Sequence, residues 1–159
     1  MKKLLLIRHA KAVHDPAYQD FERPLKPSGV RDAEAMAEKL LHEKIVPQVL
    51  ISSPSLRTLS TANIFSEFLS LPRAKEDRRI YDAARLTMLQ VINEIDNKYN
   101  FVGLVGHNPS IEQIFYYLSG DHFDFRPGAV VLIEFDTDNW ELVSNGTGTL
   151  LWHASPKDN

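Results

Sequence analysis

Short apolar runs alternate with segments of helical periodicity along the chain, and this alternation limits the possible folds more than any other feature. A short apolar run bounded by polar residues is typical of a buried strand, whereas apolar residues spaced three and four apart indicate a helix with one buried face. Strands that alternate with helices favour an α/β fold with a mostly parallel sheet. We therefore expect a three-layer α/β/α sandwich formed by a single domain over residues 1–159.

The expected helices and strands alternate along most of the chain. The helices are expected at residues 28–44, 55–70, 86–98 and 110–118, and the strands at residues 3–7, 49–51, 101–105 and, as a short one, 79–81. After the last helix, residues 129–135 and 140–143 are expected to pair as a hairpin, and residues 150–152 to form either one more strand or a docked tail.

The composition excludes several kinds of site and partner. Cysteine is absent, which rules out disulfides, thiolate metal ligands and a cysteine nucleophile and suits the cytoplasm. A formal net charge of -3 argues against bulk nucleic-acid binding. The apolar run at residues 4–7 is shorter than the roughly 7–15 residues that a signal peptide needs, and no window approaches the ~18 residues of a membrane span. We expect a cytoplasmic protein without a nucleic-acid or membrane partner.

Basic residues stand where three of the predicted strands end. Arg8 and His9 follow the first strand, Arg57 lies in the first turn of the helix after the second, and His107 follows the strand at residues 101–105. Open α/β sheets bind ligands at the carboxyl ends of their strands, so we expect these side chains to converge there.

Two of these strand ends also carry the signals of a helix start. Ser53 and Asn108 are residues that favour the N-cap position, and each is followed by proline, which favours the first helical position. Free N–H groups and aligned peptide dipoles at helix N-termini attract anions. Guanidinium groups grip a tetrahedral oxyanion through several charge-assisted hydrogen bonds. The three strand ends together therefore predict a phosphate pocket.

The motifs at these positions resemble a known family. Arg-His-Ala at residues 8–10, Ser-Ser-Pro-Ser-Leu-Arg-Thr at residues 52–58 and Gly-His-Asn at residues 106–108 are similar to those of the histidine phosphatase superfamily, also called phosphoglycerate-mutase-like. Within it, Arg-Pro-Leu at residues 23–25 and Ser-Gly at residues 28–29 resemble the small bacterial phosphohistidine phosphatases, the SixA-like group. The resemblance extends over essentially the whole chain.

The resemblance implies a phosphatase with a histidine nucleophile. His9 would be phosphorylated and then hydrolysed, while Arg8, Arg57, His107 and Asn108 would bind the phosphoryl group. Neutral imidazole has a lone pair available near pH 7, and its attack divides transfer to water into two steps. Because the arginines and a protonated His107 would supply the positive charge, neither a metal nor a cofactor is implied.

Two further positions leave alternatives open. Larger family members carry a glutamate after the third strand that protonates the leaving group, and Asp82 is the candidate at the matching place here; it is either a general acid or a turn residue. Arg23 either orients the substrate or pairs with Glu22 or Asp20 on the surface. An imidazole is a better leaving group than an alkoxide and needs less help from a general acid. The shorter Asp82 in place of the usual glutamate therefore favours a nitrogen-linked phosphoryl substrate. The family's usual glycine after the histidine is replaced by Ala10.

A metal site is the alternative that uses some of the same residues. Nitrogen and oxygen ligands would be available at His9, His14, Asp15 and His107. Two arginines in the same pocket would repel a cation, and ligand types alone rarely make a metal site. We therefore expect no metal.

The sequence thus predicts a metal-independent phosphatase that removes phosphate from phosphohistidine on a protein. Its partner would be a phosphorylated protein, for example a phosphohistidine-carrying signalling or phosphotransfer domain. Two alternatives remain, a phosphomonoesterase acting on small phosphorylated metabolites and a non-catalytic module that binds phosphoproteins.

Overall fold

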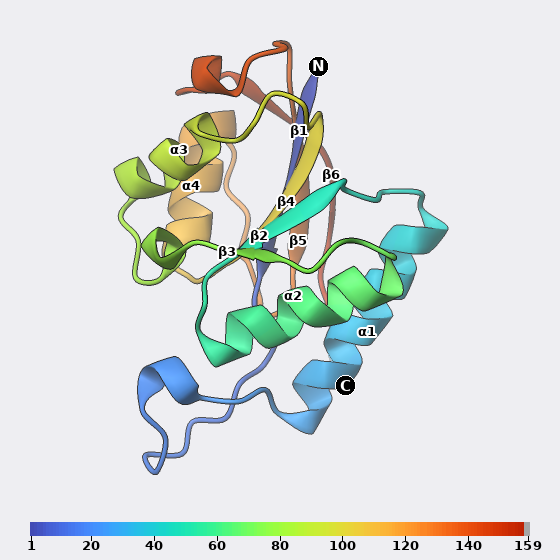
Figure 1. Cartoon of the computed structure of the whole chain (residues 1–159), viewed down its shortest axis with the longest axis vertical. Coiled ribbons are helices and arrows are strands. Elements are labelled where there is room, and N and C mark those ends of the chain that lie inside the picture. Colours follow the sequence, from blue (N-terminus) through green and yellow to red (C-terminus); the bar gives the residue numbers. More distant parts are fainter. Residues whose placement is uncertain (158–159) are drawn as a thin grey trace.

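A six-stranded mixed sheet forms the centre of the molecule in the computed structural model, which describes residues 1–157 (Figure 1). The strand order is β3-β2-β4-β1-β5-β6, and β3, β2, β4 and β1 run parallel, whereas β5 and β6 are antiparallel to their neighbours. The strands are β1 (Lys2–Arg8), β2 (Val49–Ser52), β3 (Lys75–Glu76), β4 (Phe101–Gly106), β5 (Val130–Phe135) and β6 (Gly148–Ala154).

Four helices cover the two faces of this sheet. One pair packs on one face and the other pair on the opposite face, which confirms the expected three-layer α/β/α sandwich (Figure 1). The first pair is α1 (Pro27–His42) and α2 (Leu56–Phe68), and the second is α3 (Arg85–Asn93) and α4 (Ser110–Ser119). None of the helices within residues 1–157 is long and apolar enough to cross a membrane.

Strand β1 shows why a continuous apolar run forms the centre of the sheet. Leu4, Leu5, Leu6 and Ile7 are all fully buried. Leu4 and Leu6 pack with the residues of α3 and α4, whereas Leu5 and Ile7 pack with those of α1 and α2. Because successive side chains of a strand point to opposite faces, a strand covered on both sides must be apolar throughout. Burying each of these side chains stabilises the fold by roughly 1.5–3 kcal/mol.

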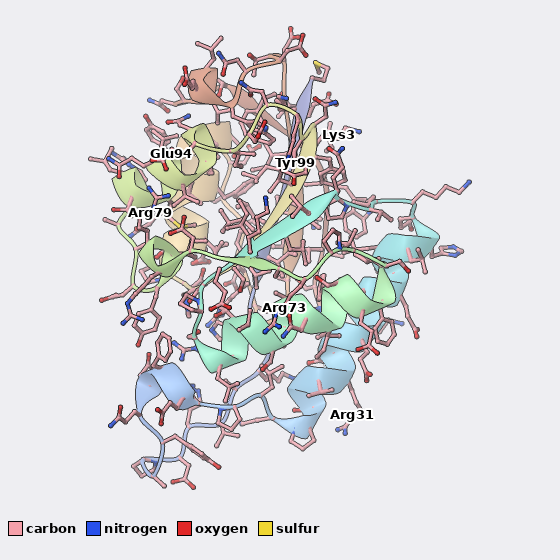
Figure 2. The ribbon with its side chains drawn as sticks, in the orientation of Figure 1. Lys3, Arg31, Arg73, Arg79, Glu94 and Tyr99 are labelled. Atoms are coloured by element: carbon pink, nitrogen blue, oxygen red, sulfur yellow. The ribbon has the colours of Figure 1, made fainter. Side chains whose placement is uncertain are left out.

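The segment between α2 and α3 differs from the prediction. Residues 79–81 do not form a strand; the short strand β3 lies earlier, and a 3-10 turn η2 (Arg78–Ile80) follows it. The side chain of Asp77 accepts a hydrogen bond from the backbone N–H of Arg79 and so starts this turn. Arg79 also forms an ion pair with Glu94, and Figure 2 shows both at the same edge of the molecule. These contacts fix the segment that leads to Tyr81.

The predicted hairpin near the C-terminus is also wrong. Strand β5 pairs with β6, so that residues 150–152 belong to a strand and not to a docked tail. Residues 140–142 form a 3-10 turn, η3 (Trp140–Leu142), which begins where the side chain of Asn139 accepts the N–H of Glu141. The Trp140 ring is fully buried and its N–H donates to the Tyr99 carbonyl. Burial of the indole therefore takes this segment out of the sheet.

The loop between β1 and α1 is held close to the start of α1. The backbone N–H of Lys26 donates to the carbonyl of Lys11 over 2.9 Å, and Ala12 and Leu25 form an isolated β-bridge. A side chain at Gly29 would overlap that same carbonyl oxygen of Lys11. Glycine is thus required for this close approach. The loop includes the 3-10 turn η1 (Asp20–Glu22), which reaches the candidate site described next.

Candidate active site

Three neighbouring parallel strands deliver the site residues to one edge of the sheet. The order β2-β4-β1 places their carboxyl ends side by side, and Arg8 is paired in register with Gly106 (Figure 1). His9 follows β1, and His107 follows β4 directly before α4. Arg57 is the second residue of α2, which begins just after β2. The predicted convergence of these residues is therefore present in the structure.

A cavity of about 240 Å³ lies at this edge. We call it the nucleophile cavity. Its lining includes His9, Arg23 and all the predicted phosphate-binding residues, which are Arg8, Arg57, His107 and Asn108. Lys11, His14 and Lys26, which were not predicted, also line it. Asp82 is the one predicted site residue that does not line it.

His9 is held as a neutral imidazole with one free nitrogen. Its Nδ1 lies 2.8 Å from the carbonyl oxygen of Ala10. Because a carbonyl only accepts, Nδ1 must carry the proton and the lone pair must be on Nε2. Burial lowers the pKa of His9 to about 3, and the positive charges of Arg57 and Arg8 act in the same direction. The ring is therefore neutral near pH 7 and has on Nε2 the lone pair that a nucleophile needs.

The two arginines each keep a buried donor without a partner. Arg57 donates from Nη1 to the carbonyl of Asp20 over 2.6 Å, and Arg8 donates from Nη1 to the carbonyl of Phe125 over 2.9 Å. The Nε atoms of both are buried and have no hydrogen-bond partner. Only 7% of the Arg57 side chain is exposed. Since an unsatisfied buried donor is costly, these atoms point to an anionic ligand as the missing partner.

Asn108 also has a buried polar atom without a hydrogen-bond partner. Its Nδ2 donates to the same Phe125 carbonyl that Arg8 uses, over 3.2 Å. Its Oδ1 is buried and has no hydrogen-bond partner. The shared carbonyl of Phe125 thus places Arg8 and Asn108 beside one another at the cavity.

His107 differs from the expectation of a protonated residue. Its Nε2 lies 2.9 Å from the Oγ of Ser53, and its Nδ1 lies 3.4 Å from Nη2 of Arg57. A guanidinium group can only donate, so Nδ1 accepts and Nε2 donates to Ser53. Burial first, and Arg57 next, lower the pKa of His107 to about 4. In the free site His107 is therefore neutral, and the positive charge resides on the arginines.

The predicted N-caps also differ in detail. Helix α2 begins at Leu56 with Ser55 as its N-cap, and α4 begins at Ser110 with Pro109 in the cap position. Ser53, expected as a cap, instead lies before the helix with its hydroxyl in contact with His107. Both helices nevertheless start at the carboxyl edge of the sheet, as predicted.

A second cavity of about 300 Å³ adjoins the first and shares Arg57, His107 and Asn108 with it. We call it the acidic cavity, because its remaining lining residues include two carboxylates: Asp20, Tyr81, Asp82, Ala83, Pro109 and Ser110. Asp82 is exposed and has a left-handed backbone with φ of 55°. Its carboxylate makes no hydrogen bond or ion pair with any residue within 1–157. Asp82 thus lies beside His107 but in the cavity that does not contain His9.

Asp20 is a site residue that the sequence reasoning treated only as a surface partner for Arg23. Its carboxylate accepts from the Tyr81 hydroxyl over 2.6 Å and from Arg57 and Arg23 over 3.1 Å each. The hydrogen bond from Tyr81, followed by those from Arg57 and Arg23, lowers the pKa of Asp20 to about 2. Asp20 therefore bridges the loop after β1 and the segment after η2 across the mouth of the site.

Of the two roles predicted for Arg23, the structure shows the ion pair, and the role in orienting the substrate stays a prediction. It lines the nucleophile cavity, and it pairs with Asp20. Its Nε also donates to the Val13 carbonyl over 2.7 Å, and its Nη2 lies 2.9 Å from Nδ1 of His14. The guanidinium is thus fixed at the rim. No group of histidine, aspartate and glutamate side chains within residues 1–157 is arranged to hold a metal ion.

The chain is similar in sequence to a family of phosphatases, which agrees with the phosphate-binding geometry of the site. Residues 4–80 match the model of the histidine phosphatase superfamily (branch 1). An uncharacterized protein of Mycobacterium tuberculosis is 28% identical over 104 residues, 65% of this chain and 64% of the relative. Phosphoserine phosphatase 1 of Hydrogenobacter thermophilus is 34% identical over 102 residues, 62% of this chain and 47% of the relative. The chain therefore matches less than two thirds of the length of either curated relative.

Solved structures resemble the chain along nearly its whole length. A SixA structure from Agrobacterium tumefaciens superposes with a TM-score of 0.84 at 23% identity and covers 98% of each chain. The protein histidine phosphatase SixA complexed with tungstate superposes with a TM-score of 0.80 at 25% identity and covers 97% of each chain. The fold is thus the phosphoglycerate-mutase-like one expected from the sequence.

Proposed function

From the match of residues 4–80 to the histidine phosphatase superfamily we propose that the chain is a member of it, a phosphatase with His9 as its nucleophile and protein-bound phosphohistidine as its substrate. One observation carries the proposal. The free Nε2 of a neutral, buried His9 shares a cavity with Arg8 and Arg57, whose Nε donors are buried and unpaired. A phosphoryl group would satisfy these donors and present its phosphorus to the lone pair of His9.

In the first step Nε2 of His9 attacks phosphorus and forms a new P–N bond. The bond to the substrate nitrogen breaks, and its electron pair leaves with that nitrogen. Arg8 and Arg57 stabilise the negative charge on the equatorial phosphoryl oxygens, a contribution of the kind that is worth about 10²–10³-fold in rate for one preorganised donor. The donation from Nδ1 of His9 to the Ala10 carbonyl keeps the ring oriented during the attack.

In the second step water attacks the phosphorylated His9. The P–N bond to Nε2 breaks and its electron pair returns to the ring, which keeps its proton on Nδ1. The oxygen of the water bonds to phosphorus, and both protons of the water leave with the phosphate. Because two guanidinium groups already supply positive charge at the phosphoryl position, the proposed reaction is metal-independent. EDTA should leave activity unchanged, and a loss of activity that zinc or manganese restores would contradict this part of the proposal.

The exposure of the site favours a phosphorylated side chain over a free metabolite. Asp20 and Asp82 of the acidic cavity are both exposed, whereas small-molecule sites bury most of their ligand. The nucleophile cavity of about 240 Å³ and the adjoining acidic cavity of about 300 Å³ would together hold a phosphoryl group and the ring that carries it. We therefore propose a phosphorylated protein as the partner, for example a phosphohistidine-carrying signalling or phosphotransfer domain.

A phosphomonoesterase is the second candidate function. It is favoured by one relative, which is 34% identical over 102 residues and is a phosphoserine phosphatase by name. The experiment that separates the candidates compares kcat/KM on a phosphohistidine protein, a phosphoserine peptide and sugar phosphates. We expect the phosphohistidine protein to be preferred, and preference for an ester would establish the second candidate. Binding of the phosphohistidine protein without any release of phosphate would instead indicate a non-catalytic phosphoprotein-binding module.

A further inference from the structure

The two cavities of the site differ in the sign of their charge. The nucleophile cavity carries Lys11, Arg23 and Lys26 and no carboxylate, whereas the acidic cavity carries Asp20 and Asp82. The Asp20 carboxylate also pairs with Arg57 and Arg23, whereas that of Asp82 forms no hydrogen bond or ion pair with a residue within 1–157, and a carboxylate beside a bound phosphate repels the anion. The acidic cavity is therefore suited to a ligand group other than the phosphoryl oxygens.

The shared residues locate the phosphoryl group between the two cavities. Arg57 lines both, its side chain is 93% buried, and its Nε has no partner. In an in-line displacement the nucleophile and the leaving group lie on opposite sides of the phosphorus. His9 lines only the nucleophile cavity. The leaving group accordingly falls in the acidic cavity.

The contacts of Asp20 show which leaving group suits that cavity. Its carboxylate accepts from Tyr81, Arg57 and Arg23, and these hydrogen bonds hold it in the ionised form near pH 7. An ionised carboxylate has no proton to give to an alkoxide. It can accept a hydrogen bond from a positively charged group, because Oδ1 is engaged only by Arg23 and 55% of the side chain is exposed.

We propose that the acidic cavity binds the leaving imidazole of phosphohistidine as a ring protonated on its second nitrogen, with the carboxylates of Asp20 and Asp82 accepting from that N–H. This inference rests on the proposed function and defines how the site selects its substrate. When the P–N bond breaks, the electron pair stays on the departing nitrogen. The proton already on the other nitrogen makes the product neutral imidazole, so that no proton has to be delivered in this step.

The walls of the acidic cavity are also suited to a planar ring. The Tyr81 ring meets the His107 ring edge to face at a centroid distance of 5.5 Å, and it meets Phe21 in the same way at 5.2 Å. Ser110 and Ala83 also line this cavity and are held together, since the Ser110 hydroxyl donates to the Ala83 carbonyl over 2.7 Å. Aromatic rings favour such edge-to-face and stacked contacts with one another.

The test uses Asp82→Asn, because the Asp82 carboxylate has no partner within the described part of the chain and its loss should disturb no existing contact. The readout is the ratio of kcat/KM on a phosphohistidine peptide to kcat/KM on p-nitrophenyl phosphate, whose phenolate leaving group carries no proton. We expect this ratio to fall at least tenfold. Asp20→Asn should lower it in the same direction. The matched control is Asp121→Asn, which removes the same charge outside both cavities and should leave the ratio unchanged.

Each other outcome decides against the inference. An unchanged ratio in Asp82→Asn and Asp20→Asn, with wild-type turnover of the phosphohistidine peptide intact, would overturn the inference and leave the proposed function standing. A larger loss on a phosphoserine peptide than on the phosphohistidine peptide would make Asp82 a general acid and also overturn it. If the wild type hydrolyses p-nitrophenyl phosphate but not the phosphohistidine peptide, the proposed function and the inference fail together.

Discussion

At the scale of single residues, the site is governed by two histidines that remain neutral beside two arginines. The rings of His9 and His107 lie 5.4 Å apart, and only 8% and 6% of the two residues are exposed. Burial disfavours the charged form of each ring, and the nearby guanidinium groups disfavour it further. Because the histidines are neutral, Arg8 and Arg57 provide the positive charge of the site and His9 provides a lone pair.

Replacing His9, the proposed nucleophile, tests these two roles directly. We expect His9→Ala to lower phosphatase activity by at least about 10³-fold, because losing a covalent nucleophile typically costs several orders of magnitude. The fold should persist, as judged by circular dichroism and thermal unfolding. His42→Ala, at the exposed end of α1, is the control and should remain active. A fully active His9→Ala protein would end the covalent mechanism.

Asp20 is expected to matter because it holds Arg57 in place. Its carbonyl and carboxylate together accept from both terminal nitrogens of that guanidinium. Asp20→Ala removes the carboxylate contact, and a misplacement of about 1 Å in a binding group can cost 10²-fold. We therefore expect kcat/KM to fall about 10–100-fold on every phosphorylated substrate. Glu22→Ala in the same 3-10 turn should leave it unchanged, and equal effects of the two variants would contradict this role.

At the scale of elements, the sequence predicted the parts of the site that are attached to regular structure. Arg8, His9, Arg57 and His107 lie within or next to strands and helices whose periodicity is visible, and the topology then brings them together. Asp20 lies in the short 3-10 turn η1 and Tyr81 directly follows η2, and neither turn has a periodic sequence pattern. No pattern therefore indicated that the two side chains meet over 2.6 Å. The predicted hairpin failed for a related reason, because burial of Trp140 depends on tertiary contacts that no local pattern records.

Gly29 tests how the loop after β1 is positioned by α1. Alanine in place of glycine inside a helix normally stabilises by about 0.5–1 kcal/mol. Here the added Cβ would overlap the carbonyl oxygen of Lys11, which is backbone and cannot rotate away. We therefore expect Gly29→Ala to destabilise the fold by about 1–3 kcal/mol, the usual range for overpacking. Urea unfolding measures the free energy of unfolding of Gly29→Ala, with Ser28→Ala as the neighbouring control. A gain in stability would show that the loop at Lys11 moves to make room for the added Cβ, and would contradict this prediction.

At the scale of the whole molecule, the site lies where the two hydrophobic clusters on either side of the sheet both end. The cluster under α1 and α2 includes Ala10, and the cluster under α3 and α4 includes Ile111. His9 directly precedes Ala10 in the chain, and the backbone carbonyl of His107 accepts a hydrogen bond from the N–H of Ile111 over 2.9 Å. Both histidines are therefore buried although they line a cavity. The same burial that keeps them neutral must therefore affect the stability of the entire fold.

This coupling predicts that the protein loses stability on mild acidification. The folded-state pKa values of His9 and His107 are about 3 and about 4, below the unfolded value of 6.5. Between these limits the unfolded state binds more protons, so the free energy of unfolding rises with pH and the stabilisation is complete only above about pH 6.5. At pH 5 each histidine should cost about 2 kcal/mol relative to pH 7, a large part of a typical total of about 5–15 kcal/mol.

Urea unfolding at pH 7, 6 and 5 measures this loss, with the double variant His9→Gln/His107→Gln as the comparison. Glutamine does not titrate, so the double variant should lose less stability between pH 7 and pH 5 than the wild type. Asp20 does not interfere, because its pKa of about 2 places its own titration below this window. An equal loss in the two proteins would show that other groups control the acid response, and that the two histidines of the site are not held neutral by the fold.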